Sequence, residues 1–369
     1  MNNLKWAIGY LCIFLSSNQA YSQSQQVVLT GTQVLKFQSK IDSEQYVLDI
    51  RLPDNYTKTN KKYPVLYVTD AQWAFSSMYV GYRGQHGDGL VPDLIIVGIT
   101  WTDSYDTRRE RDFTPTTRID EDPNTGNAPK FLSVIKNEII HLIDSNYRTE
   151  KNDRALFGAS LGGLFTVYTL FHEPALFNRY IIISPALWWD DEIVFKYEKD
   201  FAKKNSSLNA KVFISSGEHE EKIDVGNRFN RFTNQLKARN YKGLEIESMV
   251  IDRMGHLGSG TMGAILGLQS VYSKKKDFMP DTFLLGKYKG LYALDKDTTL
   301  ITQKGNFIYC QLSHAGTVYG EAILHAEASD TFYIKGLSGL LKFKRNEKNM
   351  TIGYDFIDND TTVFFKRLR

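Results

Sequence analysis

Two kinds of hydrophobic pattern alternate along residues 27–275. Continuous apolar runs at 63–68 and 94–99 are typical of strands that are buried on both faces of a sheet. The segment 131–147 instead carries its apolar residues at helical spacing, on one face of a predicted helix. This alternation predicts an α/β fold, in which a mostly parallel sheet has helices on both faces.

The remaining runs extend this pattern. At the start, 27–37 and 46–52 alternate apolar and polar residues, which predicts two antiparallel strands. Further strands are predicted at the apolar runs 155–157, 180–183, 211–214 and 244–251. Further helices are predicted from residue 164 onward, over 229–236 and over 260–272.

The pattern changes near residue 280. All nine prolines lie at or before Pro280, and the segment beyond it consists of short alternating aromatic runs separated by turn signals. We therefore predict an α/β domain over 23–275, a linker over 276–283 and a small all-β domain over 284–369. The aromatic residues of the β domain are expected to form its core.

The N-terminus has the features of a cleavable signal peptide over residues 1–22. Lys5 supplies a positive end, 6–15 is an apolar stretch too short for a typical membrane span, and 20–22 (Ala-Tyr-Ser) resembles a cleavage site. We expect a mature chain that begins near Gln23 and is secreted or periplasmic, with an uncleaved anchor as the alternative. No later segment has the pattern of a membrane span.

Composition excludes several classes of function. A formal net charge of +3 gives no strong basic field for nucleic acid. Cleavage of the leader would remove Cys12 and leave Cys310 as the only cysteine, so neither an intramolecular disulfide nor a cysteine-based metal site is expected. Cys310 lies in a strand-like run and is predicted to be a packing residue. The oligomeric state is open.

The sequence Gly-Ala-Ser-Leu-Gly at 158–162 is the strongest chemical signal of the chain. It follows the apolar run 155–157 and opens an apolar helical segment. A serine at the apex of a sharp turn between strand and helix is typical of the nucleophile elbow of α/β-hydrolases. A plain strand–helix turn is the alternative. The motif therefore predicts Ser160 as a nucleophile.

A serine needs a base, and a carboxylate usually orients that base. In α/β-hydrolases the partners follow in the order serine, acid, histidine, which favours His256, between glycines late in the chain. The acid is expected in the loop after the strand 211–215. There Glu220 is the favoured candidate, Glu218 the second, and Glu221 or Asp224 are further alternatives.

The oxyanion of an acyl-transfer intermediate needs two backbone N–H donors. One is expected at Leu161, directly after the nucleophile. The other is expected in the turn after the strand 63–68, at Gln72 or Ala71, with Gln72 preferred.

These residues resemble the esterase-D-like branch of the α/β-hydrolases, also called the putative-esterase family, and most closely its siderophore esterases of the enterobactin and bacillibactin type. The resemblance covers about residues 27–275. It rests on YPVLY at 63–67 followed by Asp70, IVGI at 96–99, RRERDFTP at 108–115, GASLGG at 158–163, ISPALWW at 183–189 and GH at 255–256.

The resemblance implies Ser160 as nucleophile, His256 as base and Glu220 as acid, because family members place the acid three residues after the glycine that ends its strand. Some siderophore esterases are described as using a serine–histidine pair alone. This chain has Ala71 where the family often has glycine. The Cβ of alanine restricts the φ and ψ angles available at this turn, which contains the second predicted oxyanion donor. The β domain lies outside the resemblance. It is similar to small β domains appended to some secreted hydrolases and β-lactamase-like enzymes.

The expected function is that of a secreted serine carboxylesterase, acting through an acyl-enzyme on a siderophore-like lactone or another small ester, without metal or organic cofactor. Alternatives are a feruloyl or acetyl esterase of plant polysaccharides, acyl transfer to an alcohol, and a non-catalytic binding protein. Arg109, Trp188 and Trp189 are candidates for a substrate rim, with a solvated loop and core packing as the other interpretations. Arg111 and Asp112 are predicted to pair and fix their loop.

Overall fold

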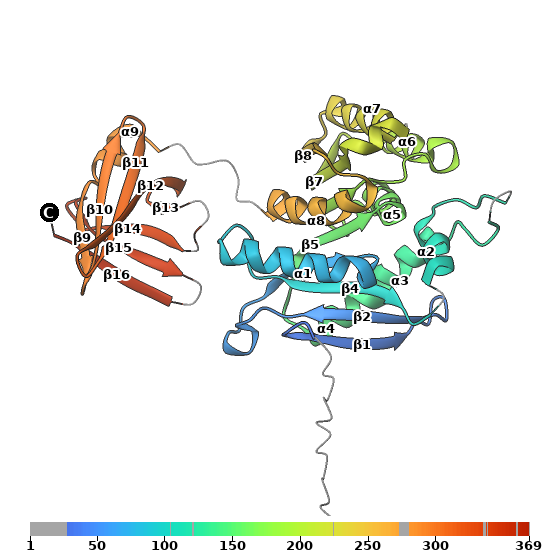
Figure 1. Cartoon of the computed structure of the whole chain (residues 1–369), viewed down its shortest axis with the longest axis horizontal. Helices are drawn as coiled ribbons and strands as arrows, with labels where there is room; N and C mark the ends of the chain where they lie inside the picture. The colour runs from blue at the N-terminus through green and yellow to red at the C-terminus, as the bar shows by residue number, and fades with distance from the viewer. Residues whose placement is uncertain are drawn as a thin grey trace, which may run out of the picture. The chain divides into compact units, whose positions relative to one another are not determined.

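The computed structural model describes residues 28–368, apart from 104, 120–121, 224, 273–279, 335–336, 338 and 359–360. The predicted signal peptide and the first half of the predicted linker, residues 276–279, therefore lie outside the described residues. Figure 1 shows an α/β part and a C-terminal β part, and each is described by itself.

The α/β part contains an eight-stranded sheet with the order β1-β2-β4-β3-β5-β6-β7-β8. Its strands are β1 (Thr32–Gln38), β2 (Gln45–Arg51), β3 (Tyr63–Val68), β4 (Ile95–Trp101), β5 (Thr149–Ala159), β6 (Arg179–Ile183), β7 (Ser207–Gly217) and β8 (Lys242–Ile251). The β1–β2 and β2–β4 pairs are antiparallel, and the pairs from β4–β3 through β7–β8 are parallel. The predicted α/β fold is thus confirmed, including the antiparallel start.

Helices cover both faces of this sheet (Figure 1). They are α1 (Ala71–Gly87), α2 (Tyr105–Phe113), α3 (Ala128–Val134), α4 (Ile140–Asn146), α5 (Leu161–His172), α6 (Trp189–Ala202), α7 (Val225–Arg239) and α8 (His256–Tyr272). Short 3-10 turns occur at η1 (Tyr56–Lys58) and η3 (Glu218–Ile223), and a π-helical turn, η2 (Ile135–Ile139), joins α3 to α4.

Alternation of side chains along the central strands explains the two layers. Ile181 and Ile183 of β6 face α8, where they lie against Gly267 and Gly263. The intervening residue Ile182 belongs to the core cluster on the opposite face, together with aromatic side chains of α5, α6 and α7. A period of two thus gives each central strand two buried faces, which is why these strands read as continuous apolar runs.

Residues 105–113, which the sequence suggested to be an Arg-rich loop, form helix α2. Its anchor is Asp112, which is fully buried and accepts hydrogen bonds from Trp101 Nε1 at 3.1 Å and Asn127 Nδ2 at 2.7 Å. Arg111 pairs with the same carboxylate at 2.8 Å, as predicted. The buried charge is stable there because each carboxylate oxygen has donors.

The C-terminal part is a closed antiparallel barrel, with the order β10-β11-β12-β13-β14-β15-β16-β9. Its elements are a short helix α9 (Thr282–Gly286) and the strands β9 (Gly290–Leu294), β10 (Asp297–Lys304), β11 (Phe307–His314), β12 (Thr317–Ala328), β13 (Thr331–Tyr333), β14 (Leu340–Arg345), β15 (Thr351–Asp358) and β16 (Thr361–Arg367). Aromatic residues fill the interior, as predicted; the Tyr354 and Phe365 rings stack at 4.8 Å. Cys310 is buried among them, and burial raises the pKa of its thiol to about 11.

Candidate active site

Ser160 occupies the sharp turn between β5 and α5, with φ 57° and ψ −118°. A non-glycine residue rarely adopts positive φ, and such strain persists where the surroundings fix it. Here Ser160 N donates to Ile183 O at 3.0 Å, and Ser160 O accepts from Ala186 N at 3.0 Å. The backbone N–H and C=O of Ser160 are therefore held by the end of β6 and by the segment that follows it.

The flanking glycines are required because strand and helix cross at contact distance. A Cβ on Gly158 would lie 2.0 Å from the carbonyl oxygen of Gly162. A Cβ on Gly162 would lie 2.7 Å from Thr69 Oγ1. Both distances are below any non-bonded contact, so the small residues of the motif are dictated by packing.

His256 and Glu220 form a hydrogen-bonded pair. His256 is the first residue of α8 and not part of the preceding loop, and its Nδ1 lies 2.7 Å from Glu220 Oε2. Because a carboxylate only accepts, Nδ1 carries the proton and Nε2 is left as the basic nitrogen of the neutral ring. This is the orientation that a general base for a serine requires.

The second oxygen of Glu220 is held by two further donors. Glu220 Oε1 accepts from Ser184 Oγ at 2.6 Å and from Gly217 N at 2.7 Å. Ser259 Oγ lies 3.1 Å from the same oxygen and 2.8 Å from the carbonyl oxygen of His256, and its single hydrogen is shared between them. Burial alone would raise the pKa of Glu220, but the hydrogen bonds from His256, Ser184 and Gly217 outweigh it and lower the pKa to about 2. Sequence reasoning missed Ser184 and Ser259; neither lies in the acid loop.

The competing carboxylates have other surroundings. Glu218 is exposed and its Oε2 accepts from Arg253 N at 2.7 Å. The side chains of Glu221 and Asp224 lie outside the described residues. Of the candidates that the structure describes, Glu220 is thus the one brought against His256.

The low pKa of Glu220 predicts a specific pH dependence of stability. Its ordinary pKa of 4.5 falls to about 2 in the folded protein, so its contribution is complete above about pH 4.5 and is lost as the pH falls toward 2. We expect the melting temperature to fall less steeply in that window for Glu220→Gln than for the wild type. Glu218→Gln, in the same loop, is the control: the hydrogen bond from Arg253 N also lowers the pKa of Glu218, but this carboxylate is exposed, so the slope should change less than for Glu220→Gln. Equal slopes for the wild type and Glu220→Gln would contradict this.

Ser160 and His256 line one cavity of about 550 Å³. Its other walls include Asp70, Trp73 and Leu257, the last two of which are exposed at the mouth. Most of the lining is apolar, and the volume suits a small organic group. The structure therefore places a serine and a histidine–carboxylate pair on one pocket.

Arg109, a predicted rim residue, also lines this cavity, but its charge is already paired. Its Nε donates to Asp70 Oδ1 at 2.9 Å, and its Nη2 lies 3.4 Å from the carbonyl oxygen of Ala159. Tyr105 OH donates to the same Asp70 oxygen at 2.6 Å. Burial raises the pKa of Asp70, and Arg109 opposes that shift. Arg109 thus links Asp70, the residue before α1, to Ala159 at the elbow.

The predicted oxyanion donors both lie in first turns of helices. Leu161 begins α5, directly after Ser160, and Gln72 is the second residue of α1. The side chain of Gln72 points elsewhere, since its Oε1 accepts from Thr100 Oγ1 at 2.7 Å. Asp70, before α1, has a left-handed backbone, with φ 57° and ψ 41°, which turns the chain into the helix. First-turn amides have no intrahelical acceptor, so these N–H groups are suited to an anion.

The two adjacent tryptophans have different surroundings. Trp189 is 5% exposed and donates its Nε1 hydrogen to Thr116 Oγ1 at 3.0 Å, so it is a core residue and not part of a rim. Trp188 is 44% exposed, with its ring centroid 5.8 Å from that of Trp189. A role in substrate binding stays a prediction for Trp188 alone.

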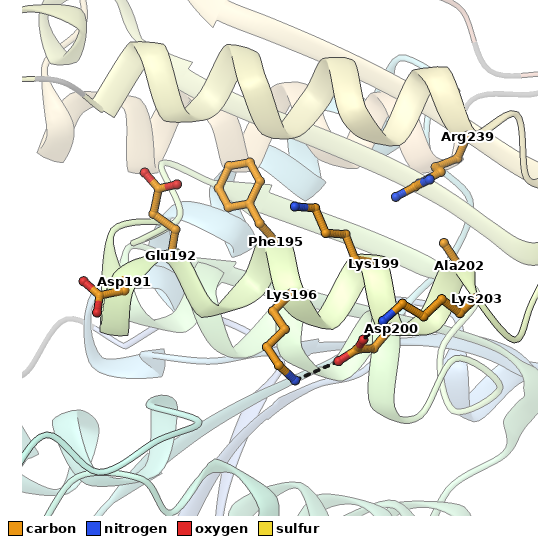
Figure 2. A pocket seen from close by; sticks show the side chains of 9 residues that line it. All are labelled: Asp191, Glu192, Phe195, Lys196, Lys199, Asp200, Ala202, Lys203 and Arg239. Atoms are coloured by element: carbon orange, nitrogen blue, oxygen red, sulfur yellow. Dashed lines mark hydrogen bonds and ion pairs between the residues drawn. The ribbon is translucent and has the colours of Figure 1, made fainter.

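A larger hollow, of about 770 Å³, lies along α6, and Figure 2 shows its lining. Charged side chains of both signs dominate it, including the Lys196–Asp200 ion pair at 2.8 Å. It contains no predicted site residue. Its chemistry is that of a solvated groove, so the smaller cavity at Ser160 is the candidate active site.

Two further searches concern the described part of the chain. In it, no group of three or more histidine, cysteine, aspartate or glutamate side chains is arranged to hold a metal ion. None of its helices combines the length and apolar character needed to cross a membrane.

The fold and the elbow define the class as an α/β-hydrolase. Comparison with known proteins gives the family: residues 39–254 match the family model described as "Putative esterase", and the chain belongs to that family.

Individual proteins that are similar to this chain are consistent with the family assignment. The chain is 27% identical over 254 residues to the ferri-bacillibactin esterase BesA of Bacillus subtilis, covering 63% of this chain and 87% of that protein. It is 23% identical over 251 residues to an endo-1,4-beta-xylanase/feruloyl esterase of Xylanibacter ruminicola, covering 64% and 30%. The crystal structure of the BES protein from Bacillus cereus matches with a TM-score of 0.60 and 26% identity, covering 68% and 97%.

Proposed function

We propose that the protein is a serine carboxylesterase that works through an acyl-enzyme. One observation carries this proposal: Ser160, at a strained apex, and His256, hydrogen-bonded to buried Glu220, line the same cavity. The family assignment supports ester hydrolysis as the reaction.

The proposed chemistry follows from the geometry. Ser160 Oγ attacks the ester carbonyl carbon while His256 Nε2 takes its proton, and Glu220 stabilises the resulting imidazolium. The amides of Leu161 and Gln72 stabilise the oxyanion. The carbon–oxygen bond to the leaving alcohol then breaks, and His256 returns the proton to that alcohol. Water repeats the sequence on the acyl-enzyme and releases the acid.

The proposed substrates are siderophore-like lactones or other small esters. The support comes from the relative named as a ferri-bacillibactin esterase, which this chain covers over most of its length. The mainly apolar cavity with an exposed Trp73 at its mouth also suits aromatic acyl groups. The feruloyl esterase reading is the second candidate, because a bifunctional relative is named for that activity.

A substrate panel distinguishes these candidates. We expect measurable kcat/KM on short p-nitrophenyl esters and at least tenfold higher values on a catecholate trilactone than on methyl ferulate. The reverse ratio would favour the feruloyl esterase. Added alcohol acceptors, followed by product analysis, would reveal acyl transfer. A folded protein that hydrolyses none of these esters and resists a fluorophosphonate probe would contradict catalysis and favour a binding protein.

We also propose that the protein is exported. The support is the sequence of residues 1–22, with its positive end, apolar stretch and small residues before Gln23. N-terminal sequencing of the protein from the producing cell would test it, since an intact Met1 would contradict cleavage.

A further inference from the structure

We propose that the C-terminal barrel is itself a binding module, which takes a small neutral aromatic molecule into a cavity at one of its mouths. The cavity has a volume of about 250 Å³. Eight-stranded barrels are wide enough either to be filled by side chains or to hold one small ligand. The proposal concerns a second site and does not depend on the esterase activity.

The register of β10 and β11 shows how the cavity is built. Consecutive inward pairs are Ile301 with Cys310, Thr299 with Leu312 and Asp297 with His314. The first pair is fully buried, whereas Leu312 is 38% exposed and the last pair lies in solvent at the rim. The cavity therefore runs from a buried floor at Cys310 to an open mouth at His314.

The inner walls are aromatic and aliphatic. Rings of Tyr354, Phe356 and Phe365 line one side, with Leu341 of the neighbouring strand among them. The polar atom of this wall is already satisfied, because Tyr354 OH lies 2.7 Å from Thr299 Oγ1. Such a lining favours an uncharged ring, since an ion would lose its hydration without gaining a partner.

Apart from the Thr299–Tyr354 pair, the polar side chains at the inward positions lie at the mouth. They are His314 and Asp297, whose Nδ1 and Oδ1 atoms are 2.6 Å apart. A hydroxyl on the bound ring can meet these groups while the ring stays in the apolar part. An anionic substituent would face the carboxylate of Asp297, which disfavours it.

The volume and the surface both indicate an occupant. An engineered apolar cavity of about 150 Å³ is enough to bind benzene, so about 250 Å³ accommodates one substituted ring. Two apolar side chains that line the mouth, Tyr319 and Leu337, are 54% and 53% exposed. Grouped around an apolar cavity, they form an entrance of the kind that ligand sites have.

The test uses the full chain and para-fluorophenol, followed by fluorine NMR titration. We expect saturable binding to the wild type and at least tenfold weaker binding to Leu312→Trp, in which the indole fills the mouth. Leu300→Trp is the matched control, because Leu300 is 40% exposed on β10 but faces outward and does not line the cavity. It should bind like the wild type. Leu312→Phe provides a smaller filling if the tryptophan variant fails to fold.

Three results would overturn the proposal. They are no saturable binding to the wild type, binding that survives in folded Leu312 variants and therefore lies elsewhere, or equal loss in the Leu300 and Leu312 variants. Para-fluorobenzoate tests the charge: it should bind at least tenfold more weakly than para-fluorophenol, and equal affinity would contradict the neutral class of ligand.

Discussion

Replacing Ser160 with alanine is expected to lower kcat/KM for p-nitrophenyl acetate by at least about 10⁴-fold, because the acyl-enzyme can no longer form. The fold should be retained, since the backbone of residue 160 is held by Ile183 and Ala186 and not by the hydroxyl. Initial rates at saturating and limiting substrate, measured beside the wild type, would give both kinetic constants.

Ser184→Ala is the control for this prediction. Ser184 is a buried serine of the same cavity with positive φ, but its hydroxyl donates to Glu220 and is not positioned as a nucleophile. Its loss should cost roughly tenfold in kcat through the orientation of the acid, and fluorophosphonate labelling should persist. An active, labelled Ser160→Ala protein would show that another residue is the nucleophile.

Gly158→Ala is expected to destabilise the α/β part by about 3 kcal/mol or more, because the added methyl group meets backbone that cannot move aside. The carbonyl carbon and oxygen of Gly162 would lie 2.4 and 2.0 Å away. For a domain of this size, that loss lowers the melting temperature by roughly 6–12 °C. Differential scanning calorimetry of the full chain would measure the melting temperature. A parallel melt followed by tryptophan fluorescence would report on the same transition.

Gly84→Ala is the matched control, for which we expect no destabilisation. Gly84 lies in α1 with nothing within 4 Å of its added Cβ, so alanine should leave the melting temperature unchanged or raise it slightly through helix propensity. If Gly158→Ala melted with the wild type, the crossing of β5 and α5 would have to be looser than the structure shows.

Most of the fold could be predicted because its strands and helices have hydrophobic patterns that are visible within short segments of the sequence. Runs such as 63–68 and 94–99 are buried on both faces and could hardly be anything but central strands. The helix at 105–113 does not follow from the sequence pattern because the segment is polar; it is fixed by contacts outside itself, those of Asp112 with Trp101 and of Arg111 with the distant Glu44. The predicted domain limits stay predictions, because residues 273–279 lie outside the described part.

The site, like the fold, has residues that local sequence identifies and residues that only the folded structure identifies. The elbow could be found because its glycines and serine are adjacent in sequence. The residues of the acid loop alone leave Glu218, Glu220 and Glu221 open, because the 3-10 turn η3 determines which side chain faces His256. The resemblance to the family selects Glu220 through its spacing from Gly217. Trp189 shows the reverse case: an aromatic residue beside the motif looks like a rim, but only burial reveals it as core.

Closure of the C-terminal barrel has a consequence for contacts between copies of the protein. A closed barrel has no free strand edge, so among the strands that the structure describes only β1 and β8, at the ends of the larger sheet, have an edge for pairing between molecules. Strand β8 carries Lys242, Glu245 and Glu247, charges of the kind that discourage edge-to-edge addition. Strand β1 has the single charge of Lys36 and an exposed Val34. If the chain ever associates by extending a sheet, β1 is the edge that admits a neighbour.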